Sequence, residues 1–230
     1  MIDRLARGRR LVRYDQRGTG LSDRAAPFPG MEVCVDDLKA VIDACGAEQV
    51  HLFAASQASP VAIAYAAQQP DRVGKLVIYG GYASGRALRA DEPNAMDEQT
   101  MLNILRAGWG KPDSPFFKAF ETLYSPDATP EQLDELIEMQ LATIGPERVA
   151  ELRQVIDRFD VSHLLPAVQA QTLVLHAEGD AIQPFSQGQK IAAGIPAARL
   201  HRLDSRNHMP LPQDPAWREM MDQIDAFLAS

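Results

Sequence analysis

Short apolar runs alternate with amphipathic stretches along most of this chain. Runs rich in leucine, valine, isoleucine and aromatic residues predict strands at residues 9–14, 50–53, 75–79, 171–177 and 199–203. Apolar faces, with proline in two of the first turns, predict helices at residues 31–45, 59–69, 185–193 and 215–228. Strands that alternate with helices at this spacing predict an α/β fold with a mostly parallel sheet.

Residues 84–166 interrupt this alternation. No strand pattern occurs there, and repeated prolines divide the stretch into short helical segments. It is rich in aromatic and sulfur-containing residues: Met96, Met101, Trp109, Phe116, Phe117, Phe120, Tyr124 and Met139. Most such side chains form the core of the segment that carries them. We therefore predict a core at residues 1–83 and 167–230 and a helical insertion at residues 84–166.

Ser56 lies at the junction between the predicted strand at residues 50–53 and the helix that follows. Its neighbours two residues away, Ala54 and Ala58, are both small. A nucleophile on a tight strand-to-helix turn needs small neighbours there, because the serine is held in a strained conformation. The same turn directs the backbone N–H of Gln57 toward a developing oxyanion. Serines in this pattern are also common helix caps, so the rest of the chain must decide between the two roles.

Two segments resemble the α/β-hydrolase superfamily. Ala-Ala-Ser-Gln-Ala at residues 54–58 is similar to the Gly-x-Ser-x-Gly nucleophile elbow, with alanine replacing both glycines. Residues 15–22 are similar to the Asp-x-Arg-Gly-x-Gly-x-Ser loop after the fourth strand of that fold, which has a mainly structural role. Residues 9–23, the elbow and residues 173–210 look like the hydrolase domains found beside some bacterial transcription regulators and adenylate cyclases. The resemblance implies a cap over the active site, formed by the insertion, and hydrolysis of a carboxylic ester.

The chain order of that superfamily assigns a nucleophile, then an acid, then a histidine. Here the order selects Ser56, Asp180 and His208, each after a predicted strand at the sheet edge where ligands bind. His208 would take the proton of the serine hydroxyl and pass it to the leaving group. Asp180 would hold the imidazole in the required tautomer and stabilise its cation. A serine nucleophile argues against haloalkane dehalogenase and epoxide hydrolase chemistry, which this fold performs with aspartate.

Other residues of the same types compete for these roles. Ser59 falls in the first turn of the following helix and is expected to be buried. Glu178 and Asp204 are alternative acids. Four histidines lie within or before predicted elements and are expected to be structural or exposed: His51, His163, His176 and His201. We expect His208 to lie outside the core, so that its replacement leaves thermal stability roughly unchanged.

The chain departs from the superfamily pattern at its N-terminus. Three strands of the fold should precede residues 15–22, and only about ten residues come before that region here. A shortened protein and a truncated reading frame both explain this. The loop after the missing third strand normally supplies a second oxyanion N–H, and losing one such donor typically costs about 10²–10³ in turnover. The strand at residues 11–14 can pair directly with residues 50–53 or leave a gap. We predict direct pairing in a five-stranded sheet, because buried backbone groups need partners. We also predict self-association as a two-fold dimer through this under-covered side.

Composition limits the classes of partner. The 230 residues suit one α/β domain with an insertion, and the net charge of −8 without a basic run argues against nucleic acid and anionic membranes. No apolar run reaches transmembrane length, and the first residues lack the apolar core of a signal peptide. Cys34 and Cys45 lie too far apart on one predicted helix to form a disulfide, which indicates a reducing cytoplasm. No metal-ligand spacing occurs, and we expect neither a metal nor a cofactor.

These patterns predict a cytoplasmic serine esterase that cleaves a small, largely apolar carboxylic ester. Ser56, Asp180 and His208 would form the triad, with Gln57 in the oxyanion hole. We expect aromatic side chains of the insertion to form the substrate pocket: Trp109, Phe116, Phe117 and Phe120. The alternative is a catalytically impaired hydrolase scaffold that binds a ligand or a partner. It is motivated by the two alanines at the elbow and by the missing oxyanion loop.

Overall fold

A parallel sheet of four strands, in the order β1-β2-β3-β4, forms the centre of the molecule. The structure is a computed structural model, and it describes residues 1–28, 30–89, 98–111 and 114–230. The strands are β1 (Val50–Ala55), β2 (Val73–Tyr79), β3 (Gln171–Ala177) and β4 (Ala198–Leu203). Each pair of neighbouring strands is parallel. The α/β architecture predicted from the alternating pattern is confirmed.

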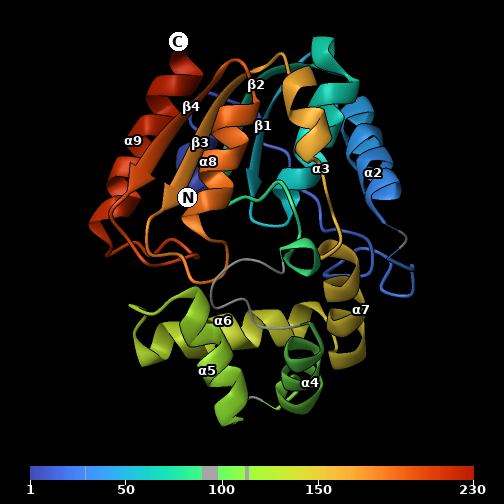
Figure 1. Ribbon diagram of the computed structural model, residues 1–230, viewed down its shortest axis with the longest axis vertical. Coiled ribbons are helices and arrows are strands. Elements are labelled where there is room, and N and C mark those ends of the chain that lie inside the picture. Colours follow the sequence, from blue (N-terminus) through green and yellow to red (C-terminus); the bar gives the residue numbers. More distant parts are fainter. Residues whose placement is uncertain (29, 90–97, 112–113) are drawn as a thin grey trace.

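Helices cover both faces of this sheet (Figure 1). They are α1 (Ile2–Leu5), α2 (Met31–Ala44), α3 (Ala58–Gln68), α8 (Phe185–Gly194) and α9 (Pro215–Ala229). Leu76 and Ile78 pack with α2, α3 and α8, whereas Val77 and Tyr79 pack with α1 and α9. This alternation follows the two-residue repeat of a strand. Burial on both faces also explains why the central strands are continuous apolar runs.

In the part of the insertion that the structure describes, four α-helices form a separate layer. They are α4 (Glu98–Gly108), α5 (Pro115–Tyr124), α6 (Pro130–Thr143) and α7 (Pro146–Ile156). Proline occupies the first turn of α5, α6 and α7, where it has no hydrogen bond to lose, so the prolines that divide the sequence mark helix starts. In Figure 1 the strand arrows point toward this layer. The layer therefore lies over the carboxyl ends of the strands.

Three short 3₁₀ helices complete the described elements: η1 (Pro70–Arg72), η2 (Arg86–Leu88) and η3 (Ser162–Ala167). The last two lie at the two ends of the insertion. Tyr82, which lies between β2 and η2, donates its hydroxyl to the carbonyl of Ile156 at the end of α7, at 3.0 Å. The chain leaving β2 is therefore attached to the insertion from the start.

Residues 9–14 form no strand, and the predicted five-stranded sheet is wrong. Leu11, Val12 and Tyr14 are 36%, 44% and 43% exposed. Arg10 donates to the carbonyl of Cys45 at 3.1 Å, which attaches the segment to the end of α2 rather than to the sheet. An apolar run becomes a strand only where a neighbour accepts its backbone hydrogen bonds, and residues 9–14 have no such neighbour. β1 is consequently an edge strand.

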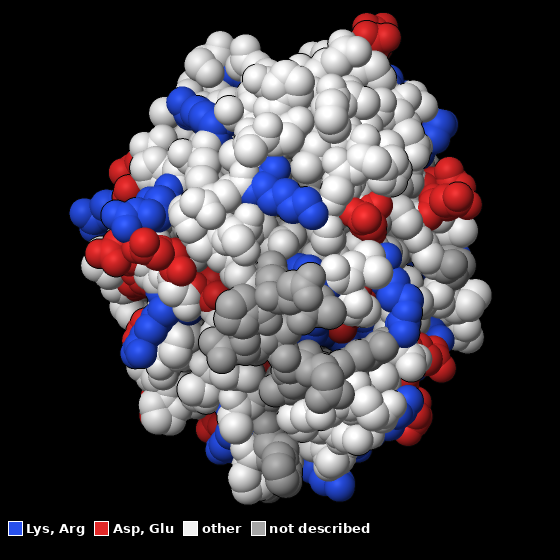
Figure 2. All heavy atoms as spheres, viewed as in Figure 1, with Lys and Arg blue, Asp and Glu red and all other residues white. Residues whose placement is uncertain are grey.

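The surface carries charges of both signs. On the face shown in Figure 2, basic and acidic side chains are interspersed. Within the described ranges, no helix is long and apolar enough to cross a membrane. Cys34 and Cys45 are both free thiols.

The free edge of β1 generates a prediction about assembly. An exposed edge strand presents unpaired N–H and C=O groups, so we expect two copies to pair β1 with β1 about a two-fold axis. Light scattering at micromolar concentration should give the mass of a dimer. His51→Glu on β1 should favour the monomer, because it places two carboxylates near the axis, whereas His163→Glu, at an exposed site outside the sheet, should not. A monomeric wild-type protein would contradict this prediction.

Candidate active site

Ser56 adopts a backbone conformation that is rare for serine. Its φ is +49°, the only positive φ at a non-glycine position among the described residues. Ser56 and Gln57 alone connect β1 to α3, and the Ser56 N–H donates to the carbonyl of Tyr79 at the end of β2, at 2.9 Å. Such a conformation costs about 1–3 kcal/mol and persists only where the surroundings impose it. The turn therefore has the geometry of the elbow predicted for this serine.

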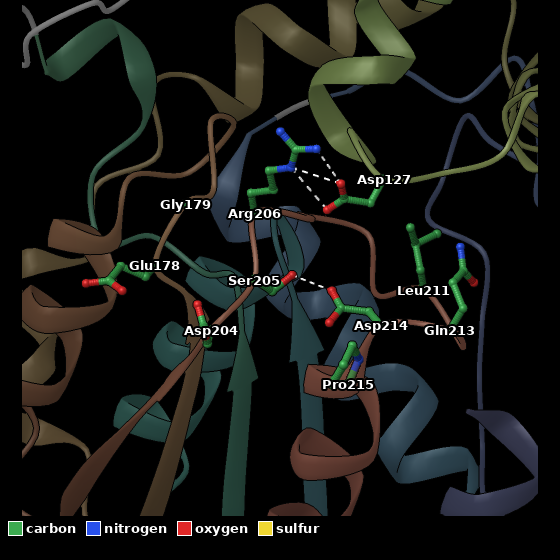
Figure 3. Close-up of a pocket in the computed structure, with 10 residues that line it drawn as sticks. All are labelled: Asp127, Glu178, Gly179, Asp204, Ser205, Arg206, Leu211, Gln213, Asp214 and Pro215. Carbon is green, nitrogen blue, oxygen red and sulfur yellow. Dashed lines mark hydrogen bonds and ion pairs between the residues drawn. The ribbon is translucent and has the colours of Figure 1, made fainter.

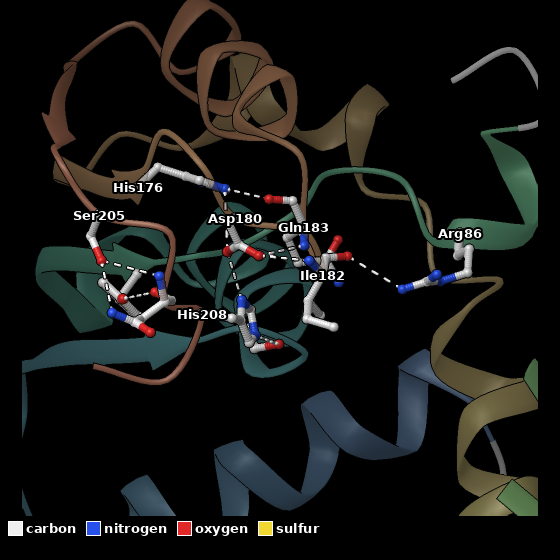
Figure 4. A network of polar contacts seen from close by, with 10 residues as sticks. Arg86, His176, Asp180, Ile182, Gln183, Ser205 and His208 are labelled. Carbon is white, nitrogen blue, oxygen red and sulfur yellow. Dashed lines mark hydrogen bonds and ion pairs between the residues drawn. The ribbon is translucent and has the colours of Figure 1, made fainter. Parts of the chain in front are cut away.

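His208 connects Ser56 to Asp180 through its two ring nitrogens. Nε2 lies 2.8 Å from the Ser56 hydroxyl. Nδ1 lies 2.7 Å from Asp180 Oδ2 (Figure 4). The other carboxylate oxygen accepts from the N–H groups of Ile182 and Gln183 at 2.8 and 2.9 Å. Because an ionised carboxylate only accepts, Nδ1 carries the ring proton and Nε2 is left to accept from the hydroxyl. This is the tautomer that a general base for Ser56 requires.

The expectation that His208 lies outside the core is wrong. The exposed fractions of the His208 and Asp180 side chains are 2% and 1%. The histidine follows the last strand, but the insertion covers the loop that carries it. A smaller side chain at this position would leave a cavity, so its replacement is expected to reduce stability.

Gly80 lies against the side chains of His208 and Asp180. The sequence pattern did not single it out as part of the site. It follows β2 with a φ of +54°, and a Cβ atom there would lie 3.3 Å from the His208 ring and 3.5 Å from Asp180 Oδ2. The His208 ring would have to shift slightly to admit a side chain, and the positive φ itself favours glycine at this position. The only signal in the sequence was the Gly-Gly pair that ends the strand.

His176 lies on the side of Asp180 opposite to His208 (Figure 4). The ring is fully buried, and Nε2 lies 2.8 Å from the carbonyl of Gln183 and 3.8 Å from Asp180 Oδ2. A carbonyl only accepts, so Nε2 carries the proton, and burial lowers the pKa of His176 and keeps the ring neutral. A neutral N–H thus faces the Asp180 carboxylate.

The competing residues lie apart from this hydrogen-bonded chain. Ser59 is fully buried, and its hydroxyl has no hydrogen-bond partner in the described part of the chain. Glu178 and Asp204 are exposed, and the Glu178 carboxylate binds Arg202 at 2.6 Å. The remaining histidines are on the surface or paired elsewhere: His51, His163 and His201.

The loop that carries His208 is bound to the α5–α6 connection on both sides of the histidine. The Asn207 side chain accepts from the N–H of Asp127 at 3.1 Å and donates to its carboxylate at 3.1 Å. The N–H of Met209 donates to the carbonyl of Tyr124 at 2.9 Å. The position of the histidine is therefore set partly by the insertion.

A surface pocket of about 530 Å³ opens beside this loop (Figure 3). In Figure 3 Arg206 points toward Asp127, which it binds at 3.0 Å. The lining includes neither Ser56 nor His208, and it is acidic: Asp127, Glu178, Asp204 and Asp214. This pocket is separate from the hydrogen-bonded chain.

A row of aromatic rings runs from the insertion to His208. Trp109 lies 4.7 Å from Phe117 and 6.3 Å from Phe120, between ring centroids. Phe120 lies 5.1 Å from Tyr124, whose ring meets His208 edge-to-face at 5.5 Å. Tyr124, absent from the predicted pocket, is the ring that contacts the histidine. Met96 and the Phe116 side chain lie outside the described residues.

The glycine-rich loop at residues 15–22 has a structural arrangement. Asp15 accepts from the N–H of Leu21 at 2.9 Å, and a Cβ at Gly20, where φ is +56°, would lie 2.4 Å from the same carboxylate. Arg17 forms an ion pair with Asp37 on α2. These contacts close the loop on itself and attach it to the core.

No group of three or more possible metal-ligating His, Cys, Asp or Glu side chains occurs in residues 1–28, 30–89, 98–111 and 114–230. The side chains described above bring together a hydroxyl, an imidazole and a carboxylate.

Glu121 is a buried carboxyl one helical turn before Tyr124. It is fully shielded from solvent, and it accepts a hydrogen bond from Gln140 on α6 at 2.6 Å. Burial raises the pKa of Glu121 from 4.5 to about 7, although the hydrogen bond opposes this.

The raised pKa of Glu121 predicts a pH-dependent stability. The folded protein holds this proton more tightly than the unfolded chain, so stability falls as pH rises from about 4.5 to 7, by about 3 kcal/mol in total. Glu121→Gln keeps an acceptor and cannot ionise. Measured by denaturant unfolding, the free energy of unfolding of Glu121→Gln should exceed that of the wild-type protein by about 3 kcal/mol at pH 8. The difference should become progressively smaller toward pH 4.5. Glu138→Gln, at an exposed site on α6, serves as control; a pH-independent effect of Glu121→Gln would contradict the prediction.

Comparison with known proteins is consistent with this site. A family model described as the alpha/beta hydrolase fold matches residues 1–215. A 2-hydroxy-6-oxononadienedioate/2-hydroxy-6-oxononatrienedioate hydrolase from Cupriavidus pinatubonensis is 29% identical over 212 residues, which are 89% of this chain and 71% of that protein. A putative carbamate hydrolase from Caulobacter segnis is 27% identical over 215 residues, 89% of this chain and 76% of its own length.

Solved structures are similar over nearly the whole chain. An esterase from Exiguobacterium antarcticum has a TM-score of 0.79 at 21% identity, over 94% of this chain and 80% of its own. A thermophilic esterase from Thermogutta terrifontis has a TM-score of 0.71 at 26% identity, over 94% of this chain and 78% of its own.

Proposed function

The chain belongs to the alpha/beta hydrolase fold family, and we propose that it is a serine hydrolase that cleaves a small, largely apolar carboxylic ester. The observation that carries this proposal is the hydrogen-bonded chain from Ser56 through His208 to Asp180, built on a serine with a φ of +49°. The relatives named above are all hydrolases, which supports the reaction class. Their names cover different bonds, and the choice of an ester is supported by the similarity to the esterase from Thermogutta terrifontis.

Each group has a step in the proposed reaction. His208 Nε2 takes the hydroxyl proton while Ser56 Oγ forms a bond to the ester carbonyl carbon. Asp180 stabilises the resulting imidazolium, and the backbone N–H of Gln57 donates to the oxyanion. The alcohol then leaves with the proton from His208, and an acyl-enzyme remains on Ser56. Water, activated by His208, releases the acid and restores the serine.

A fluorophosphonate probe tests the nucleophile directly. We expect mass spectrometry to find the added mass at Ser56 in the wild-type protein and in Ser59→Ala, and to find none in Ser56→Ala. His208→Ala should lower turnover of p-nitrophenyl esters by roughly 10⁴–10⁶, with thermal denaturation showing that the variant is folded. Folded wild-type protein that is not labelled would instead support the scaffold that binds a ligand or partner.

We further propose that at least one of Trp109, Phe116, Phe117 and Phe120 lines an apolar acyl or alcohol pocket. Phe120 is the best placed of the three whose side chains are described, because its ring contacts Tyr124, which contacts His208. Phe120→Ala should raise KM for long-chain p-nitrophenyl esters more than for the acetate. Leu123→Ala, at an exposed site on α5, should raise neither. Equal effects of Phe120→Ala across chain lengths would mean that this ring only packs within the insertion.

A further inference from the structure

Two arginine side chains beside the active site carry buried N–H groups without an acceptor. They are Arg86 in η2 and Arg153 on α7. Nε of Arg86 and Nη2 of Arg153 are shielded from solvent, and neither has a hydrogen-bond partner among the described residues. Buried polar groups in folded proteins almost always have a partner. These two groups therefore point to an acceptor that the described side chains do not provide.

Both arginines are close to the triad. Arg86 Nη2 donates to the carbonyl of Ile182 at 3.3 Å, and the N–H of Ile182 donates to Asp180 at 2.8 Å (Figure 4). The backbone of Ile182 thus connects the guanidinium of Arg86 to the Asp180 carboxylate. Arg153 reaches the same region from the insertion, because the N–H of Ala87, next to Arg86, is bonded to the carbonyl of Asp157 on the turn after α7.

Tyr124 connects the arginines to the histidine. Its ring contacts His208 at 5.5 Å between centroids. Its hydroxyl lies within electrostatic range of Arg153 and Arg86, whose charges oppose the rise that burial causes in the pKa of Tyr124. The charges of both arginines therefore act on the tyrosine whose ring contacts the histidine.

The two arginines differ in their partners. Arg153 Nε binds the Asp157 carboxylate at 3.1 Å, but Arg86 binds no carboxylate among the described residues. Burial, and then the charge of Arg153, lowers the pKa of Arg86, although a guanidinium remains protonated. Glu121 is the other carboxyl near Tyr124, and its raised pKa keeps it mostly neutral below pH 7. The described charges that act on Arg86 are those of Arg153, Arg89 and Asp157, so cations outnumber carboxylates around it. An anion beside Arg86 would reduce this repulsion.

We propose that Arg86 and Arg153 bind a carboxylate at the end of the substrate remote from the scissile ester. A guanidinium matches the two oxygens of a carboxylate with parallel N–H groups. The substrate would then be a half-ester of a short dicarboxylic acid, whose apolar linker lies along Tyr124. This inference rests on the proposed ester hydrolysis and specifies its substrate class.

Two esters of equal length test the subsite. The p-nitrophenyl monoester of glutaric acid carries a free carboxylate, and its methyl-capped counterpart is neutral. We expect the wild-type protein to favour the anionic ester in kcat/KM by about tenfold or more. Arg86→Gln and Arg153→Gln should each bring this ratio close to one. Arg158→Gln, at an exposed site after α7, should leave the ratio unchanged.

Binding without turnover separates the subsite from the reaction. Titration calorimetry should show that glutarate binds to the Ser56→Ala variant. This binding should be lost in the double variants that combine Ser56→Ala with Arg86→Gln or with Arg153→Gln. Equal cleavage of both esters, with a ratio that the arginine variants do not change, would overturn the subsite and leave the ester hydrolysis intact. Arginine-dependent glutarate binding by a folded protein that cleaves neither ester would support the subsite and overturn the hydrolysis. A folded protein that neither binds glutarate nor cleaves either ester would overturn both the subsite and the hydrolysis.

Discussion

The hydrogen bond between His208 Nδ1 and Asp180 Oδ2 is the contact around which the site is built. At 2.7 Å, between two side chains that are almost completely buried, it sets the ring orientation and the tautomer. Its two partners come from the loops after β3 and β4, so the register of that strand pair fixes their spacing. Gly80 keeps the space beneath them open, and the N–H groups of Ile182 and Gln183 hold the carboxylate from the other side.

The insertion takes part in this arrangement as well as covering it. The Asn207–Asp127 contacts and the Met209–Tyr124 hydrogen bond hold the histidine loop to the end of α5. A displacement of the α5–α6 connection would therefore change the distance between His208 and Ser56. The same helix contributes Tyr124, whose ring contacts the histidine. In the function proposed here, substrate binding beneath the insertion is coupled to the position of His208 relative to Ser56, because both depend on the end of α5.

Much of the fold and the identity of the three central residues could be predicted without coordinates. Periodicity identified β2, β3 and β4 within two residues of their ends, because continuous apolar runs are long and strongly patterned in a parallel sheet. The order of Ser56, Asp180 and His208 along the chain was informative because each follows a strand, and parallel strands present their carboxyl ends at one edge. The same logic failed at residues 9–14. Pairing depends on a neighbour in space, which a local pattern does not reveal.

By itself, the sequence determined the alternation of strands and helices, the helical insertion and the candidate triad. All of these depend on the spacing of residue types along the chain. The tertiary structure alone decided the edge position of β1, the burial of His208, the contact of Tyr124 with it and the unpartnered N–H groups of Arg86 and Arg153. Burial, hydrogen bonding and ring contacts depend on residues that are distant in the chain. Tyr124 and His208 are 84 positions apart, and no periodicity connects them.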